Sequence, residues 1–333
     1  MSERSDAAIP EAADFASDQT IRWCPGCGDY AILKGVQKTL AERALPRERT
    51  VFISGIGCSS RLPYYLATYG FHTIHGRAPA IATGVKMANP ALDVWVITGD
   101  GDGLSIGGNH LLHALRRDRD MQILLFNNAI YGLTKGQVSP TSQIGTFSPT
   151  SPGGSTVRPV SAVRFALGAG GRFIARTVDV QQKQLPRVLS RAAAHPGTAF
   201  VEILQNCPVY NDGAFADITD RDRGADWQLV LEHGAPMRFG ADEAYGIRLD
   251  PTSLRPEVVA LRDGFGTGDL LVHDETNPVL AGLLAEMAPP DFPLPLGVLY
   301  AAPAEGGTPD APDERRSDGD FNNLLRSEGT YRL

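Results

Sequence analysis

DVWVITGDGDGLSIGGNH (Asp93–His110) and MQILLFNNAIYG (Met121–Gly132) are the two stretches that decide the fold. Each begins with a short apolar run, which is typical of a strand buried inside a parallel sheet. The first run ends in alternating glycines and aspartates and the second in an asparagine pair, at the strand ends where open α/β sheets bind ligands. Glycines there let backbone N–H groups approach an anion. Together with the oxygens of Asp100 and Asn128, this pattern predicts Mg²⁺ bridged to a diphosphate.

The spacing of these polar residues resembles a known motif. Gly99-Asp100-Gly101 followed by Asn127-Asn128 is similar to the motif of thiamine-diphosphate (ThDP) enzymes. In that family the aspartate, the last asparagine and a carbonyl two residues later hold the Mg²⁺ of Mg-ThDP. The resemblance therefore implies Asp100, Asn128 and the Ile130 backbone as metal ligands. The alternative is a Gly/Asp turn and an Asn-capped loop in an unrelated Rossmann-like sheet.

Composition limits the class of protein. The chain has 333 residues, of which 42% are hydrophobic and 21% charged, an ordinary globular balance. The net charge of −7 argues against a nucleic-acid binder. No apolar run approaches the length of a membrane span. The first residues, MSERSDAAIPEAADFAS, lack the hydrophobic segment of a signal peptide, so we expect a cytoplasmic protein with a mobile arm over residues 1–18.

Strand-like and helix-like patterns alternate between residues 30 and 207. This alternation predicts a doubly wound, mostly parallel sheet, which we expect to be an α/β domain over residues 19–210. Leu62–Tyr69 is expected to be a helix with Pro63 in its first turn. The remaining expected strands are Thr50–Ile53, Phe173–Val178 and Ala199–Leu204.

Two segments do not follow this alternation of strands and helices. Residues 138–156 are rich in Ser, Thr, Pro and Gly, and a loop of this length is a lid, a binding loop, a partner surface or a disordered insertion. Residues 211–333 lose the alternation and end in a Pro/Gly/Asp-rich stretch. We expect them to form an irregular C-terminal extension that wraps a partner or the core.

The four cysteines admit three interpretations. Cys24-Pro25-Gly26-Cys27 is the C-x-x-C of a redox dithiol, but that chemistry leaves Cys58 and Cys207 unexplained. A structural zinc site usually pairs two C-x-x-C units, and this chain has one. An iron–sulfur cluster with four thiolate ligands uses all four residues. Because Cys58 follows a predicted strand at the edge of the ThDP loops, such a cluster would lie beside the cofactor.

Six motifs in order resemble one family. They are CPGCGDY, SGIGCSS, HGRAPAIATGVKMANP, GDGD, NNAIYGLTKGQ and NCP. In this order they are similar to the β subunit of 2-oxoacid:ferredoxin oxidoreductases, and most of all to the two-subunit 2-oxoglutarate type. The resemblance covers about residues 20–210 and implies the ThDP-binding fold.

The resemblance implies a set of functional residues. The thiols that would ligate one [4Fe–4S] cluster are Cys24, Cys27, Cys58 and Cys207. The residues that would contact ThDP are Ile56, Gly57, Cys58, Ser59, His75, Gly76, Gly101, Asp102, Gly132 and Leu133. Arg61 stands where the family has a basic residue for the substrate carboxylate, and its guanidinium suits a dicarboxylic 2-oxo acid. His75 is the second expected catalytic residue, facing the diphosphate or the substrate oxygen.

The family also implies partners. ThDP needs a glutamate beside its aminopyrimidine ring, and none occurs in the motif-bearing loops. In the family an α subunit supplies it, so the implied assembly is (αβ)₂. The implied reaction is the reversible, CoA-dependent oxidative decarboxylation of 2-oxoglutarate to succinyl-CoA and CO₂, with electrons passed to ferredoxin.

Three alternatives remain open from the sequence. The first keeps this chemistry but acts on pyruvate or another 2-oxo acid. The second is a non-redox ThDP decarboxylase with structural zinc. The third is an iron–sulfur electron-transfer subunit without ThDP.

Overall fold

The computed structural model describes residues 10–302, which are built around an eight-stranded sheet of order β2-β1-β3-β4-β6-β5-β11-β7. The first six strands in that order are parallel, β11 runs antiparallel to β5, and β7 is parallel to β11. The strands are β1 (Thr50–Ser54), β2 (Tyr69–His72), β3 (Asp93–Gly99), β4 (Met121–Asn127), β5 (Phe173–Val178), β6 (Thr198–Leu204), β7 (Gln228–Val230) and β11 (Leu294–Ala301). The sequence prediction of a mostly parallel α/β sheet is confirmed.

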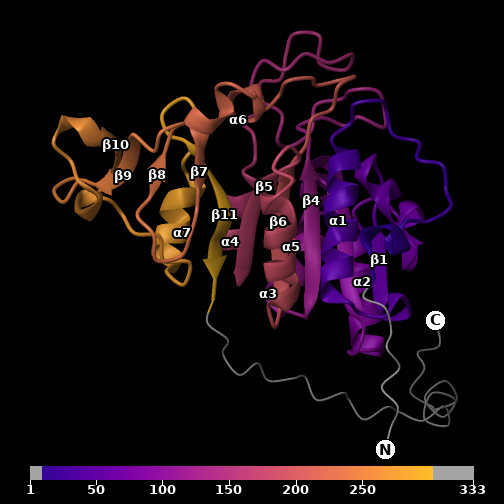
Figure 1. Cartoon of the computed structure of the whole chain (residues 1–333). Coiled ribbons are helices and arrows are strands. Elements are labelled where there is room, and N and C mark those ends of the chain that lie inside the picture. The colour runs from indigo at the N-terminus through magenta and orange to yellow at the C-terminus, as the bar shows by residue number, and fades with distance from the viewer. Residues whose placement is uncertain (1–9, 303–333) are drawn as a thin grey trace, which may run out of the picture. The chain divides into compact units, whose positions relative to one another are not determined.

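Helices cover both faces of this sheet (Figure 1). One face carries α1 (Asp29–Arg43) and α5 (Gln184–Ala194), and the other carries α2 (Ala78–Ala88), α3 (Gly108–Arg117) and α4 (Ala162–Gly168). Successive side chains of a strand point to opposite faces. In β3, Val94 and Val96 pack with α2 and α3, whereas Trp95 and Ile97 pack with α1 and α5. A strand buried on both faces needs this unbroken apolar run.

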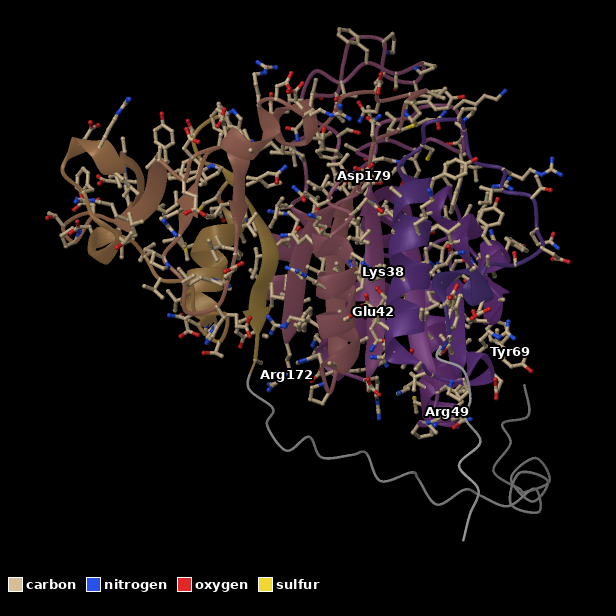
Figure 2. All side chains as sticks on the ribbon, in the orientation of Figure 1. Lys38, Glu42, Arg49, Tyr69, Arg172 and Asp179 are labelled. Carbon is tan, nitrogen blue, oxygen red and sulfur yellow. The ribbon has the colours of Figure 1, made fainter. Side chains whose placement is uncertain are left out.

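Parallel strands bring their carboxyl ends to one edge of the sheet. Arg172 precedes β5 and Asp179 follows it, and Figure 2 shows them at opposite edges. The loops after β1, β3, β4 and β6 lie at the same edge as Asp179. This topology brings together the motif residues, which are far apart in the chain.

The expected helix over Leu62–Tyr69 is wrong. The structure has a 3₁₀ helix over Ser59–Tyr65, and Tyr69 begins the edge strand β2, which pairs with β1. Pro63 lacks the N–H that an α-helix interior uses. The residues after it, Tyr69-Gly70-Phe71-His72, combine aromatic side chains with a glycine that disfavours a helix.

The two ends of the described chain are more ordered than expected. Ala12–Phe15 forms a 3₁₀ turn, Phe15 is buried, and its carbonyl accepts a hydrogen bond from the Ala67 N–H. The expectation of a mobile arm therefore does not hold for this turn, while residues 1–9 lie outside the described residues. The segment after 210 adds two strands, β7 and β11, to the main sheet.

The C-terminal part has further regular structure (Figure 1, orange and yellow). Its other elements are α6 (Ala216–Thr219), β8 (Arg238–Phe239), β9 (Tyr245–Leu249), β10 (Pro256–Ala260) and α7 (Pro278–Ala285). The strands β10, β9 and β8 form a separate antiparallel sheet. Residues 303–333 of the expected extension lie outside the described residues. Within the described chain no helix is both long and apolar enough to cross a membrane.

Candidate active site

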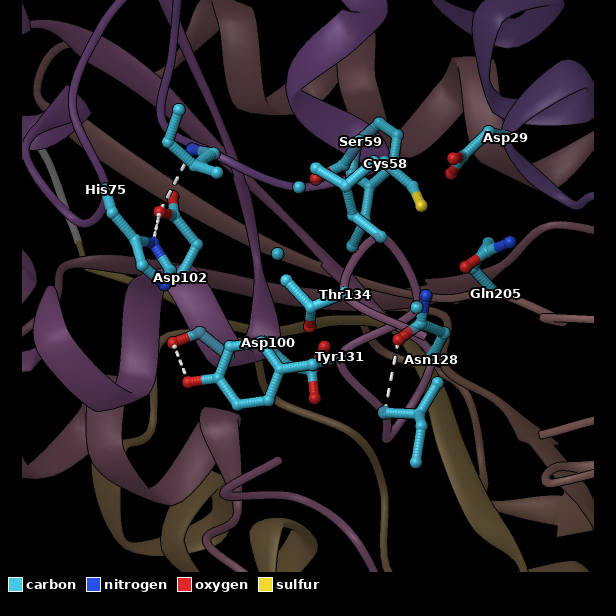
Figure 3. A pocket seen from close by; sticks show the side chains of 18 residues that line it. Asp29, Cys58, Ser59, His75, Asp100, Asp102, Asn128, Tyr131, Thr134 and Gln205 are labelled. Atoms are coloured by element: carbon cyan, nitrogen blue, oxygen red, sulfur yellow. Dashed lines mark hydrogen bonds and ion pairs between the residues drawn. The ribbon is translucent and has the colours of Figure 1, made fainter. Parts of the chain in front are cut away.

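A pocket at the carboxyl ends of β1, β3 and β4, here called the central pocket, collects most of the predicted cofactor residues (Figure 3). The predicted residues that line it are Ile56, Gly57, Cys58, Ser59, His75, Asp100, Gly101, Asp102, Asn128, Ile130, Gly132 and Leu133. Gly76 lies behind this lining and is buried. The fold thus brings together loops from four separate motifs.

Asp102 organises one wall of the central pocket. Its Oδ1 accepts hydrogen bonds from the N–H groups of Gly76 (2.7 Å) and Ile56 (3.1 Å), and its Oδ2 accepts one from the Thr98 hydroxyl (2.6 Å). His75 Nδ1 also donates to Oδ1, at 2.5 Å. This contact fixes the imidazole ring and leaves Nε2 as its other polar atom. Asp102 therefore acts on the site through the residues it holds.

Asp100, Asn128 and Ile130 provide the oxygens expected for a divalent cation. Burial raises the pKa of the Asp100 carboxyl to about 6, against the opposing hydrogen bonds of Ser139 and Thr141. The Asn128 side-chain oxygen accepts the Ile130 N–H at 3.2 Å, which closes the turn that presents both residues. A carboxylate, an amide and a carbonyl are the hard oxygen ligands that suit Mg²⁺. The donor set therefore fits the predicted metal.

Gly101 is required by a close approach. A Cβ placed there would lie 2.3 Å from the Tyr131 ring, whose hydroxyl donates to the Gly101 carbonyl at 2.9 Å. Tyr131 also lines the central pocket. The sequence analysis did not assign Tyr131 a role, although the residue lies inside the NNAIYGLTKGQ motif.

The four cysteines are free thiols, and two of them lie next to Gly132. A Cβ on Gly132 would lie 3.6 Å from the sulfurs of both Cys58 and Cys207. The charges of Cys24 and Cys207 also act on the Cys58 thiol, and Cys58 acts on Cys27. Among residues 10–302 no three His, Cys, Asp or Glu side chains are close enough to hold a single metal ion.

Burial keeps two of these thiols protonated in the free protein. It raises the pKa of Cys58 to about 12, assisted by the negative charge of Asp29, and it raises the pKa of Cys27 even further. Buried thiols of this kind are deprotonated when they bind metal. The Cys58 thiol is within electrostatic range of the other three, and all four cysteines are free, which fits the donor set of an iron–sulfur cluster.

Sequence reasoning also missed the polar side chains around Cys27. The Gln205 amide donates to the Cys27 sulfur at 3.1 Å, and Gln205 is buried. Asp29 is buried, and neither of its carboxyl oxygens has a nitrogen or oxygen hydrogen-bond partner. Burial raises the pKa of Asp29 to about 7. The negative charge of Asp179 adds to this rise, and a hydrogen bond from Cys27 opposes it. Figure 3 shows Asp29, Cys58 and Gln205 on one side of the pocket and His75 on the other. Their positions inside CPGCGDY and before NCP were the available signals.

Arg61 does not line the central pocket. It lines an adjoining cavity of about 400 Å³, here called the Arg61 pocket, together with Arg22 and His72. Ile56, Gly57 and Leu133 line both pockets. In the part of the chain that the structure describes, neither Arg22 nor Arg61 forms an ion pair, which leaves two guanidinium groups available for an anion.

Comparison with known proteins identifies the family to which this chain belongs. Residues 55–203 match the thiamine pyrophosphate enzyme family, C-terminal TPP-binding domain. The 2-oxoglutarate oxidoreductase subunit KorB of Mycobacterium tuberculosis is 54% identical over 262 residues, which are 78% of this chain and 69% of that relative. The chain belongs to the β subunits of the 2-oxoacid:ferredoxin oxidoreductases.

Two further comparisons agree with this family. The 2-oxoacid:ferredoxin oxidoreductase subunit beta of Saccharolobus solfataricus is 42% identical over 222 residues, 65% of this chain and 73% of the relative. The solved 2-oxoglutarate:ferredoxin oxidoreductase from Magnetococcus marinus, with 2-oxoglutarate, coenzyme A and succinyl-CoA bound, has a TM-score of 0.73 at 31% identity. That match covers 98% of this chain and 94% of the solved one. The predicted family and the ThDP-binding fold are confirmed.

Proposed function

We propose that this β subunit works with an α subunit to convert 2-oxoglutarate and CoA into succinyl-CoA and CO₂. Two electrons leave the substrate in this reaction and pass one at a time through a [4Fe–4S] cluster to ferredoxin. Bound ThDP supplies carbanion stabilisation and the cluster supplies one-electron chemistry. The relatives named for 2-oxoglutarate support this choice of substrate over pyruvate.

One observation carries the proposal: Gly132 lies between the oxygens proposed for Mg-ThDP and two of the four thiols, Cys58 and Cys207. On one side this glycine lines the central pocket with Asp100 and Asn128. On the other side it is next to the sulfurs of Cys58 and Cys207. A cluster held by these thiols would lie directly beside the cofactor, which is the arrangement that single-electron transfer between them needs.

Each predicted residue has a role within this proposal. Asp100, Asn128 and the Ile130 carbonyl would hold Mg²⁺ on the diphosphate. The glycines and backbone groups of the central pocket would bind ThDP along its length, and His75 would present Nε2 to the diphosphate or the substrate oxygen. Arg61 would bind the distal carboxylate of a substrate that extends over Ile56 into the Arg61 pocket.

The central pocket lacks one catalytic group. Of the residues that line it, none is a glutamate. The glutamate that activates ThDP would therefore come from the α subunit, and the working enzyme would be an (αβ)₂ assembly. Ferredoxin and CoA would bind this assembly as electron acceptor and co-substrate.

A substrate panel on the co-purified complex tests the proposal. With a viologen dye as electron acceptor, we expect 2-oxoglutarate to be used best. Arg61→Ala should lower kcat/KM for 2-oxoglutarate about 10- to 100-fold, the value of a charge-assisted hydrogen-bonded pair, and should change pyruvate use much less. Arg49→Ala is the matched control, because Arg49 lies at the opposite edge of the sheet (Figure 2). Equal losses on both substrates would contradict the role of Arg61, and a preference for pyruvate would contradict the substrate.

A further inference from the structure

The Ser/Thr/Pro/Gly-rich segment 138–156 is not uniform. Ser139, Thr141 and Ser142 are buried, although hydroxyl side chains at a loop are normally exposed. Further along the same segment, Ile144 and Phe147 are 61% and 73% exposed. The beginning of the segment is therefore packed into the protein, and its buried hydroxyl groups need specific partners.

The Thr141 hydroxyl reaches the proposed metal carboxylate. Its Oγ1 lies 2.7 Å from Asp100 Oδ2 and 2.9 Å from Asn127 Oδ1. The Ser139 hydroxyl lies 3.3 Å from the same Oγ1. Thr141 thus stands between the ends of β3 and β4, the two strands whose loops carry the proposed Mg²⁺ ligands.

A hydroxyl has one proton, so its direction must be decided between the two acceptors. The Asn127 amide is oriented by its Nδ2, which donates to Glu202 Oε1 at 2.8 Å, and its Oδ1 already accepts the Ala129 N–H at 3.1 Å. Asn127 therefore has a donor without Thr141. A hydrogen bond to an ionised carboxylate is about twice as strong as one between neutral groups. The Thr141 proton goes to Asp100.

Asn127 is itself held rigidly. Glu202, which orients its amide, forms a buried ion pair with Arg176, with 2.7 Å between Nε and Oε2. This pair joins β5 and β6, and Asn127 ends the neighbouring strand β4. Thr141 therefore bonds to Asp100 and to an Asn127 side chain that a buried network joining β4, β5 and β6 holds in place.

We propose that Thr141 is a positioning residue that holds Oδ2 of the Asp100 carboxylate and so orients this carboxylate for Mg²⁺. The inference rests on the proposed function, which makes Asp100 a ligand of the metal. The hydroxyl fixes Oδ2 and supports the charge of the buried carboxylate before the metal arrives. Partners behind a metal ligand typically change metal affinity 10- to 100-fold when removed.

The test is a Mg²⁺ titration of the αβ complex after removal of Mg²⁺ and ThDP. Binding of added ThDP is followed by calorimetry, so that the readout does not depend on turnover. Thr141→Val keeps the shape of the side chain but removes the hydroxyl, and it should raise the half-saturating Mg²⁺ concentration 10- to 100-fold. Thr141→Ser keeps the hydroxyl and should restore binding close to that of the unmodified complex.

Thr177→Val is the matched control. Thr177 is equally buried, and its hydroxyl donates to Gln184 Oε1 at 3.0 Å, away from the proposed metal. The Thr177→Val variant should leave the half-saturating Mg²⁺ concentration unchanged. If Thr141→Val fails to fold, Thr141→Ala supports the same comparison.

Asp100→Asn separates the two hypotheses. If Asp100→Asn weakens Mg²⁺ binding and Thr141→Val does not, the role of Thr141 is overturned. If Asp100→Asn leaves Mg²⁺ binding intact, the metal site of the proposed function fails, whatever Thr141 does.

Discussion

The carboxyl edge of the sheet and the C-terminal part, residues 208–302, differ in how many buried polar side-chain atoms lack a hydrogen-bond partner. Around Cys27 the buried oxygens of Asp29, Asp179 and Gln205 include four without hydrogen-bond partners among nitrogen or oxygen atoms. In residues 208–302 only one buried side-chain atom, His273 Nδ1, lacks a hydrogen-bond partner. Charged residues there form ion pairs at the surface instead, such as Arg248 with Glu257.

This difference indicates that the carboxyl edge is a functional site and that the C-terminal part is a structural scaffold. A buried polar group without a partner costs about 1–3 kcal/mol, so it persists where it has another use. Exposed ion pairs contribute about 0–1 kcal/mol and are easily replaced. We therefore expect substitutions at the carboxyl edge to alter cofactor chemistry, and those in the C-terminal part to alter stability slightly.

The largest effect is expected from loss of a thiol. If the proposed cluster is present, Cys58→Ser should remove almost all iron and the visible absorbance of the αβ complex, because one of its four proposed ligands is lost. Ser60→Ala, two residues further on and also buried, should keep both. Iron and zinc analysis of the purified complex provides the measurement. Zinc in place of iron in the unmodified protein would contradict the cluster and favour the structural-zinc alternative.

A smaller effect is expected at Gln205. Its N–H donates to the Cys27 sulfur, and such a bond stabilises the electron-rich reduced cluster more than the oxidised one. Gln205→Leu should therefore make the cluster harder to reduce, by about a tenfold change in the reduced-to-oxidised ratio, or about 59 mV for one electron. A potentiometric titration followed by electron paramagnetic resonance measures this.

Gln122→Leu controls for the loss of a buried glutamine. Gln122 is buried in β4 near the opposite edge of the sheet, and its replacement should leave the potential unchanged. A Gln205→Leu complex with full iron content and an unshifted potential would refute the tuning role.

Much of the fold was predictable because buried parallel strands have a strong pattern. The expected Phe173–Val178 coincides with β5, and the expected Thr50–Ile53 and Ala199–Leu204 each differ from β1 and β6 by one residue at one end. The prediction failed at Leu62–Tyr69, where a proline and an edge strand interrupt an apolar run. Edge strands lack the double burial that makes the central ones recognisable.

The site was predictable only where neighbouring residues form a motif. Glycines, aspartates and cysteines at strand ends identified the central pocket. Thr141 and Gln205 were missed because their contacts cross 41 and 178 residues of chain, to Asp100 and Cys27. Contacts of this range depend on how strands are ordered in the sheet, which a single sequence does not specify. The roles of the individual site residues stay predictions.

The smallest effect is expected where the C-terminal part meets α5. Arg191 donates to both oxygens of Glu275, each at 2.7 Å, from a half-exposed position. Arg191→Ala should lower the melting temperature of the complex by about 2 °C or less, since such a pair contributes up to about 1 kcal/mol. Iron content and activity should not change. A large loss of iron would mean that the C-terminal part supports the site.

The pH dependence of the stabilisation by Arg191 and Glu275 tests whether they act as an ion pair, and the direction of the change can be predicted. The hydrogen bonds from Arg191 hold the pKa of Glu275 below its ordinary value of 4.5. The folded protein therefore binds this proton less readily than the unfolded chain, so the stabilisation is present above about pH 4.5 and is lost as the pH falls through the folded value. The difference in melting temperature between the unmodified protein and Arg191→Ala should shrink on acidification. A difference that grows instead would show that the two residues do not act as an ion pair. The contact could then no longer count among the surface ion pairs that stabilise the C-terminal part.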